Sequence, residues 1–187
     1  MAEPLHALTA LGRPEPLDET IGTLRLTERI DIALASLAVR KGREGDVAAA
    51  AAAAGIPLPD PARHAAGPTH AAFWVAPGMW FLEAPFATHE DIVARLRPVF
   101  GDAASITEQT DAWICLDLSA PDLVPLFERL CAVDLAAVPE GHATRTVIEH
   151  LGCYLIVHGR GAVRLLGPRS SAASLVHALQ VAAASLG

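Results

Sequence analysis

AAFWVAPGMWFLE, residues 71–83, is the stretch that decides the fold of this chain. Aromatic and aliphatic residues fill the runs on both sides of Pro77-Gly78, and residues of these types favour strands. A Pro-Gly pair between two such runs is typical of a turn that joins antiparallel strands. The stretch therefore predicts a hairpin whose strands are AAFWVA and MWFLEA.

Further strands and helices alternate on both sides of this hairpin. Upstream, Ile32–Val39 predicts a strand, and Glu44–Ala54 predicts a helix with alanines in its body and Gly55 at its end. Strands separated by short helices and hairpins predict an α+β fold with mixed or antiparallel sheets, rather than a purely parallel doubly wound sheet. A loop is predicted at 57–68, and strands are predicted at 104–110, 112–118, 142–150, 153–157 and 162–166. Further helices are predicted from Thr88 or His89 to residue 100, at 121–131 (capped by Ser119) and at 172–186 (capped by Ser170 or Ser171).

Composition and charge disfavour several classes of protein. Of the 187 residues, 52% are hydrophobic but only 5% are aromatic, so alanine supplies much of the apolar content. The net charge of −7 and the lack of a basic block disfavour binding to nucleic acid or to an anionic membrane. The sequence shows no secretory signal and no apolar run of the roughly 20 residues that span a bilayer. We therefore expect a cytoplasmic protein in which Cys115, Cys131 and Cys153 are reduced.

The first thirty residues differ from the rest of the chain. They are rich in proline and leucine, with prolines at positions 4, 14 and 16, and they show no sustained period. A segment of this kind rarely orders alone, so residues 1–30 predict an extended arm that lies on a partner. Residues 31–187 are then expected to form the folded domain.

The sequence contains none of the common motifs for catalysis or cofactor binding. GxGxxG, GxxxxGK[ST], HExxH and GxSxG are absent, and Gly159-Arg160-Gly161 fits a hairpin turn better than a phosphate-binding loop. His142, His150 and His158 are spaced by eight, but Gly152 interrupts any strand that would align them, so we favour separate surface histidines. We predict no catalytic, cofactor-binding or metal-binding residue in this chain.

Two further groups of residues allow both a functional and a structural interpretation. Cys131 ends an apolar helical stretch and is a nucleophile if His142 lies beside it, but we favour a buried packing thiol. Trp74, Trp80 and Trp113 suit stacking on a flat ligand such as a pterin. Such residues more often fill a core, which suits a chain with few other large side chains.

Arg145 and Arg169 are the strongest polar candidates. Each lies in a short motif beside hydroxyl side chains, and a guanidinium binds a carboxylate or another anion through two parallel hydrogen bonds. The two arginines suit either an anion site or an ion pair across a subunit interface. We favour the interface, and we expect Arg169→Lys, which keeps the charge but loses the fork, to weaken assembly.

Five short motifs follow one another in the second half of the chain: TEQTDAW (107–113), LDLSAP (116–121), ERLCAVDL (128–135), GHATRT (141–146) and PRSSAASL (168–175). Together with PGMW (77–80), they resemble the gamma subunits of bacterial heterotetrameric sarcosine oxidases, in the same order from about residue 70 to the end. Ala120 replaces a glycine of that family's strand-to-helix turn, and the first thirty residues match it less clearly.

The resemblance implies more than composition does. That family is similar in fold to the folate-binding domains of the glycine-cleavage T-protein and of a tRNA-modifying GTPase, which implies two small intertwined α/β sandwich lobes within residues 31–187. It also implies a complex with alpha, beta and delta subunits that oxidatively demethylates sarcosine to glycine, makes hydrogen peroxide and passes the one-carbon unit to tetrahydrofolate. FAD, FMN and NAD are expected in the alpha and beta subunits and zinc in the delta subunit. None is expected in this chain, which the resemblance implies is a structural subunit.

Other functions remain as alternatives to this scaffold. A folate-binding module needs an aromatic pocket and a carboxylate for the pterin ring, such as Trp80 or Trp113 with Glu108 or Asp111. A subunit of a related N-methyl amine oxidase is a second alternative. A cysteine hydrolase acting through Cys131 is the least favoured.

Overall fold

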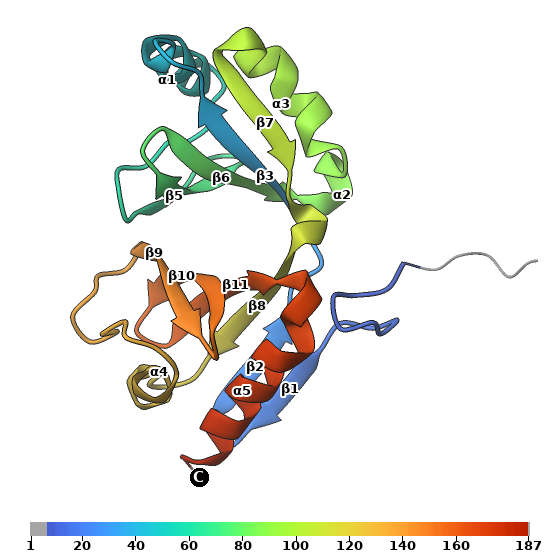
Figure 1. Ribbon diagram of the computed structural model, residues 1–187, viewed down its shortest axis with the longest axis vertical. Helices are drawn as coiled ribbons and strands as arrows, with labels where there is room; N and C mark the ends of the chain where they lie inside the picture. The colour runs from blue at the N-terminus through green and yellow to red at the C-terminus, as the bar shows by residue number, and fades with distance from the viewer. Residues whose placement is uncertain (1–6, 187) are drawn as a thin grey trace, which may run out of the picture. The chain divides into compact units, whose positions relative to one another are not determined.

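The computed structural model describes residues 7–186, which form two compact units, each built around one antiparallel sheet (Figure 1). The first unit comprises the described parts of residues 1–30 and 146–187, together with 111–138. The second unit comprises residues 31–110 and 139–145. The chain thus has the mixed α/β character predicted from the alternation of its elements.

Six strands form the sheet of the first unit, in the order β1-β2-β8-β11-β10-β9. Strand β8 is central because it pairs with β2 on one side and with β11 on the other, antiparallel in both cases. Gly159-Arg160-Gly161 links β10 to β11 as the predicted hairpin turn. The strands are β1 (Asp18–Ile21), β2 (Leu24–Glu28), β8 (Trp113–Ser119), β9 (Ala143–Ile148), β10 (Leu151–Gly159) and β11 (Ala162–Pro168).

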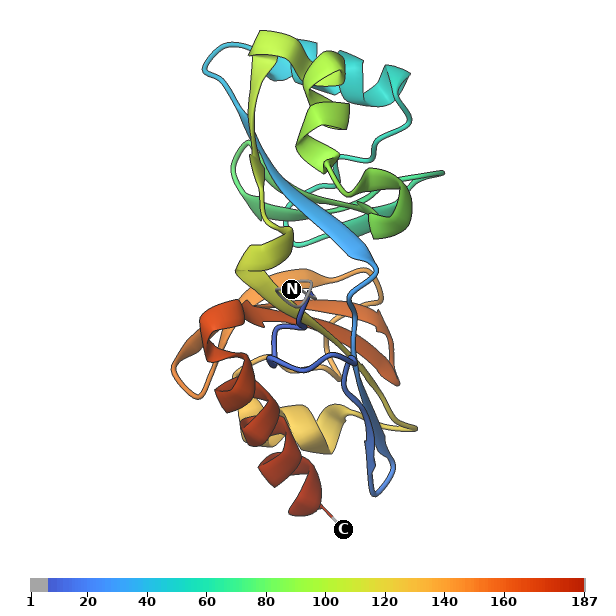
Figure 2. The ribbon, with the colours of Figure 1, turned by 90° about the vertical axis from the view of Figure 1, so that its right-hand side faces the viewer.

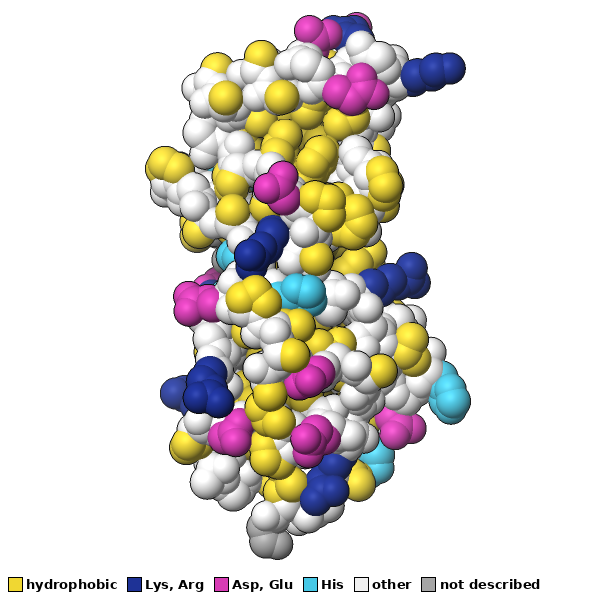
Figure 3. All heavy atoms as spheres, turned by 90° about the vertical axis from the view of Figure 1, so that its left-hand side faces the viewer, with side chains coloured by type: hydrophobic (Ala, Val, Ile, Leu, Met, Phe, Trp, Pro, Cys, Tyr) yellow, Lys and Arg dark blue, Asp and Glu magenta, His cyan; other side chains and the backbone are white. Residues whose placement is uncertain are grey.

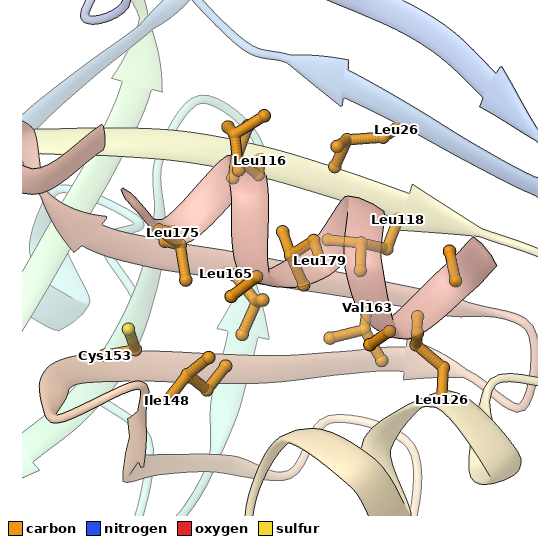
Figure 4. Packing of buried hydrophobic residues seen from close by; sticks show 14 of the residues in the cluster. Leu26, Leu116, Leu118, Leu126, Ile148, Cys153, Val163, Leu165, Leu175 and Leu179 are labelled. Carbon is orange, nitrogen blue, oxygen red and sulfur yellow. The ribbon is translucent and has the colours of Figure 1, made fainter. Parts of the chain in front are cut away.

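Helices α4 (Val124–Leu130) and α5 (Ala172–Ala184) pack on one face of this sheet. Alternate residues of β8 point to opposite faces, so Leu116 and Leu118 join the core while Asp117 lies on the face away from the helices. Figure 4 shows how the leucines of α5 meet those of the strands. Gly167 of β11 allows the close approach of α5, since a Cβ atom there would lie 2.3 Å from Cδ2 of Leu175.

Five strands form the sheet of the second unit, in the order β4-β5-β6-β3-β7. Strands β5 and β6 are the predicted hairpin, with Trp74 opposite Trp80 and Gly78 at a φ of +69° in the turn. The strands are β3 (Ile32–Val39), β4 (His64–Ala66), β5 (Ala71–Ala76), β6 (Met79–Pro85) and β7 (Ala104–Glu108).

Helices α1 (Glu44–Ala53) and α3 (Ile92–Phe100) share one core with the second sheet and lie next to each other (Figure 2). Val47 of α1 and Leu96 of α3 are almost completely buried in that core. The short α2 (Phe86–His89) follows β6 directly, and the chain also has 3₁₀ turns at Gly101–Ala103, Thr110–Ala112 and Arg169–Ser171. No helix within residues 7–186 is long and apolar enough to cross a bilayer.

The structure corrects the prediction of an extended arm at residues 1–30. Strands β1 and β2 form a hairpin, and β2 continues the sheet of the first unit by pairing with β8. The physical reason is the alternation in LRLTE (24–28), which places Leu24 and Leu26 in the core. Residues 1–6 lie outside the described part of the chain.

Three boundaries also differ from the predicted ones. The helix expected at 88–100 is two helices, because the side chain of Asp91 accepts a hydrogen bond from the backbone of Ala94 and starts α3 afresh. Ser119 ends β8 instead of capping a helix, since it pairs with Ala162 in the sheet, and α4 begins at Val124. The loop expected at 57–68 contains the short strand β4.

Candidate functional site

Arg169, a predicted interface residue, contacts other parts of the first unit. It follows β11 directly, at the start of the 3₁₀ turn that leads into α5. Its Nη1 donates to Oδ1 of Asp111 (3.2 Å), and its Nη2 donates to the backbone oxygens of Leu8 (3.0 Å) and Thr9 (3.3 Å). The guanidinium therefore already joins three segments of the chain, while about a third of the side chain stays exposed.

Glu28 also holds this N-terminal segment (residues 8–17) in place, through contacts with its backbone. Its side chain is almost completely buried, with Oε1 accepting from the backbone of Ala10 (3.0 Å) and Oε2 from that of Leu17 (3.1 Å). The backbone of Glu28 also donates to the carbonyl of Leu17 (2.7 Å). Glu28 and Arg169 together satisfy polar backbone groups of a segment that has no strand or helix of its own. Sequence reasoning missed Glu28, since both partners of its carboxylate are backbone amides.

Arg145, the second predicted interface residue, is exposed on β9. From Arg145 onward the strand alternates, because Arg145 and Val147 are exposed (Val147 58%) whereas Thr146 and Ile148 are buried. Within residues 7–186, no hydrogen bond or ion pair engages the Arg145 side chain. Arg145 and Arg169 thus differ, since only Arg169 has a role within the described part of the chain.

Asp117 holds two arginines on the face of the first sheet away from the helices. Arg164 donates from Nε to Oδ1 (2.7 Å) and from Nη2 to Oδ2 (3.1 Å), and Arg29 donates from Nη1 to Oδ2 (2.6 Å). Burial raises the pKa of Asp117, but the hydrogen bonds and charges of Arg164 and Arg29 outweigh it, so the net shift is downward. The carboxylate is therefore ionised at neutral pH and ties β11, and Arg29 directly after β2, to β8.

The residues considered for a pterin site all make contacts within the protein. Trp80 donates from Nε1 to the carbonyl of Pro59 (2.8 Å), and Trp113 meets Tyr154 edge to face with ring centres 5.2 Å apart. Glu108 accepts hydrogen bonds from the backbone and the hydroxyl of Thr110. Asp111 is the ion-pair partner of Arg169 described above. Trp80 and Glu108 belong to the second unit, whereas Trp113 and Asp111 belong to the first.

The cysteine and histidine candidates are also dispersed. Cys131 ends α4 in the first unit and packs against the core that contains Cys153, whereas His142 belongs to the second unit. His142 precedes β9, His150 occupies the turn after it with a φ of +67°, and His158 lies in β10, so one strand does not align them. Among the described residues, no group of three or more histidine, cysteine, aspartate or glutamate side chains is placed to hold a metal ion.

We expect Cys153 to be the least reactive of the three thiols. Burial, followed by the nearby Cys131, raises the pKa of Cys153 to about 11, which leaves about one thiolate per thousand thiols at pH 8. Cys115 and Cys131 are only partly buried. With an aromatic disulfide reagent at pH 8, two thiols should react in the folded protein and the third only on unfolding. Cys153→Ala should abolish the slow thiol, and a slow thiol that persists in this variant would contradict the assignment.

The sequence matches no protein-family model and no curated protein. A chain in the structure of heterotetrameric sarcosine oxidase from Corynebacterium sp. U-96, in complex with pyrrole 2-carboxylate, has a similar fold, with 21% identity and a TM-score of 0.77. The similarity covers 90% of this chain and 87% of that chain. The crystal structure of glycine cleavage system aminomethyltransferase T from Bartonella henselae has 12% identity and a TM-score of 0.59, with 82% of this chain and 44% of that chain covered. This chain therefore has a fold shared with a chain of a heterotetrameric sarcosine oxidase and with part of an aminomethyltransferase.

Proposed function

We propose that this chain is the gamma-type structural subunit of a heterotetrameric sarcosine oxidase. One observation carries the proposal: the similarity to the sarcosine oxidase chain extends over 90% of this chain and 87% of that one, at a TM-score of 0.77. Because the similarity covers most of both chains, it indicates that the sarcosine oxidase chain is a counterpart of this whole chain rather than a protein that shares one domain with it. In this proposal the complex demethylates sarcosine to glycine, with hydrogen peroxide and methylene-tetrahydrofolate as products.

The motifs that resemble the gamma subunits have structural roles here, which supports a structural subunit. In TEQTDAW, the hydroxyl of Thr110 accepts a hydrogen bond from the backbone of Leu34 (2.9 Å) and so attaches the end of β7 to β3. Asp111, the next residue, pairs with Arg169 of the PRSSAASL motif. Two of the motifs thus meet in one ion pair.

Exposed apolar surface supports a subunit that contacts partners. After Asp46, α1 has no charged residue, and its outward side consists of Ala48, Ala49, Ala52 and Ala53. Figure 3 shows apolar side chains between scattered charged groups on one face of the molecule. Depletion of charge is a feature of the buried centre of protein interfaces. We propose that such surfaces meet the alpha, beta or delta subunits, and that FAD, FMN, NAD and zinc reside in those partners.

Purification of the tagged chain from its native host tests the proposal. We expect larger subunits to co-elute and the eluate to show flavin absorbance, together with sarcosine-dependent release of hydrogen peroxide. Flavin and partners with activity on another N-methyl amine would identify the related oxidase instead. A colourless chain that elutes alone from a host expressing the partner genes would contradict the proposal.

Variants of the two candidate interface arginines separate assembly from folding. Arg145→Ala should reduce co-purification of the partners without changing the melting temperature, because this side chain has no described intramolecular partner. Arg169→Lys loses the fork that reaches Leu8, Thr9 and Asp111, so it should cost about 1 kcal/mol of stability as well as weaken assembly. Normal co-purification of both variants would remove the arginines from the proposed interface.

Folate binding is the second candidate function, motivated by the fold shared with the aminomethyltransferase. The proposed pterin residues are engaged within the protein, so we expect titration of the isolated chain with tetrahydrofolate to leave its tryptophan fluorescence unchanged. Saturable quenching that Trp80→Phe or Trp113→Phe abolishes would establish a folate module instead.

A further inference from the structure

Two histidines meet at one end of the sheet of the second unit. His70 immediately precedes β5, and His89 is the last residue of α2, which follows β6. Because β5 and β6 are antiparallel neighbours, the start of one lies beside the end of the other. The two ring centres are 5.0 Å apart, with an angle of 81° between the ring planes. No part of the proposed structural role uses this pair.

This spacing fits two imidazoles bound to one metal ion. A metal–nitrogen bond of about 2.1 Å places the ion about 3.2 Å from each ring centre, and a tetrahedral angle then separates the two centres by about 5 Å. The observed 5.0 Å agrees with that value. The steep angle between the planes is compatible with such a site, since each metal–nitrogen bond has only to lie in the plane of its own ring and sets no angle between the two rings.

The ring nitrogens are suited to such a site. Nε2 of His70 is buried and has no hydrogen-bond partner within residues 7–186. Nδ1 of His89 shares a hydrogen bond of 2.8 Å with the hydroxyl of Thr88, and when Nδ1 donates, Nε2 presents its lone pair.

Solvent reaches the neighbourhood of the pair. Thr88 and Glu90, the residues on either side of His89, line a surface hollow of about 410 Å³ together with Asp91 and Arg95. Neither histidine lines this hollow itself, but His70 and His89 are only partly buried, so water can reach the pair and fill the coordination positions that it leaves open. A buried imidazole nitrogen without a partner calls for an explanation, and a shared metal ion supplies one.

We propose that His70 and His89 bind one late first-row divalent transition-metal ion through their Nε2 atoms, with water completing its coordination. Imidazole nitrogen is a preferred ligand of nickel, copper and zinc. The proposal is independent of the proposed function, because it concerns a site within the second unit alone.

Titration of the purified full-length chain with Cu²⁺, followed by electron paramagnetic resonance, tests the site. We expect one equivalent to bind with hyperfine structure from two nitrogens, and His70→Ala or His89→Ala to weaken it at least about tenfold. His177→Ala, which removes an exposed histidine of α5, is the matched control and should leave the affinity unchanged. Equal binding by wild type and both site variants would overturn the proposal, as would loss of binding in the control alone.

A second measurement covers the case in which a site variant unfolds. In wild-type protein, ¹⁵N-edited spectra of the imidazoles should show Zn²⁺ shifting Nε2 of both histidines together at one equivalent. Thr88→Val, which removes the hydroxyl that orients His89, should weaken Zn²⁺ binding about tenfold without loss of fold. Unshifted Nε2 signals at saturating Zn²⁺ would show that His70 only packs against the ring of His89, and the metal site would be rejected.

Discussion

Replacing Glu28 by alanine should lower the free energy of unfolding by about 3 kcal/mol, because two backbone amides lose a charged acceptor. Those amides belong to Ala10 and Leu17, and the Glu28 side chain that receives them is almost completely buried. Alanine is too short to reach either, and the cavity it leaves is closed to most water. Urea unfolding at pH 7 measures the loss, and hydrogen exchange of the Leu17 amide should accelerate in parallel.

Two further variants control this result. Glu28→Gln keeps the size and one acceptor, so it should cost about half as much. Glu15→Ala removes an exposed carboxylate of the same N-terminal segment and should leave stability unchanged. If Glu28→Ala were as stable as Glu15→Ala, the carboxylate would not anchor residues 8–17.

Asp117→Asn should lower the free energy of unfolding by about 2 kcal/mol. This loss is smaller than that expected on breaking a fully buried ion pair, because solvent still reaches the carboxylate. The substitution keeps the shape but removes the charge that holds Arg29 and Arg164. Asp18→Asn is a matched control, since Asp18 also binds a guanidinium through two hydrogen bonds, to Nε and Nη2 of Arg25, but on an exposed edge strand. We expect no measurable change there. Equal effects at both positions would show that burial does not set the strength of these pairs.

The Asp117 pair should also depend on pH in a defined direction. Its pKa in the folded protein is below the ordinary value of 3.8, so ionised Asp117 contributes its full stabilisation above that value. The contribution is lost as the pH falls through 3.8 towards the folded pKa, where the carboxyl becomes protonated. Unfolding curves of wild type and Asp117→Asn should therefore differ most at neutral pH and converge in acid. Curves that stay parallel down to pH 2 would contradict the assignment.

Local signals were sufficient to predict much of the fold. The Pro77-Gly78 turn marks the β5–β6 hairpin, and Gly55 marks the end of the first helix. The β1–β2 hairpin was missed although Gly22, with a φ of +57°, separates its strands. In β2 the buried positions are Leu24, Leu26 and Glu28. Because acidic residues are rarely buried, Glu28 interrupts the alternation of apolar and polar residues from which a strand is predicted.

The polar clusters were far less predictable, because their partners are distant in sequence. Asp117 meets residues 88 and 47 positions away, and Arg169 meets the carbonyl of Leu8 161 positions away. No local period encodes such pairs. The motif that contains Arg169 was recognised, but its contacts with Leu8 and Thr9 depend on the position of the segment before β1. The His70–His89 pair has no sequence signature either. The two residues are separated by 18 others along the chain, and only the β5–β6 hairpin brings them together in space.

The second unit interrupts the first along the chain, and this has a consequence for synthesis on the ribosome. All five strands of the second sheet lie within residues 31–110, so that sheet can form as soon as this stretch emerges. By contrast, β8 of the first sheet lacks one of its two neighbouring strands until β11, at residues 162–168, has been synthesised. Until then Leu116 and Leu118 have neither their second strand nor the helix α5 to cover them. A nascent chain paused near residue 138 would therefore expose the core of its first unit, and this intermediate is the one that we expect chaperones to bind.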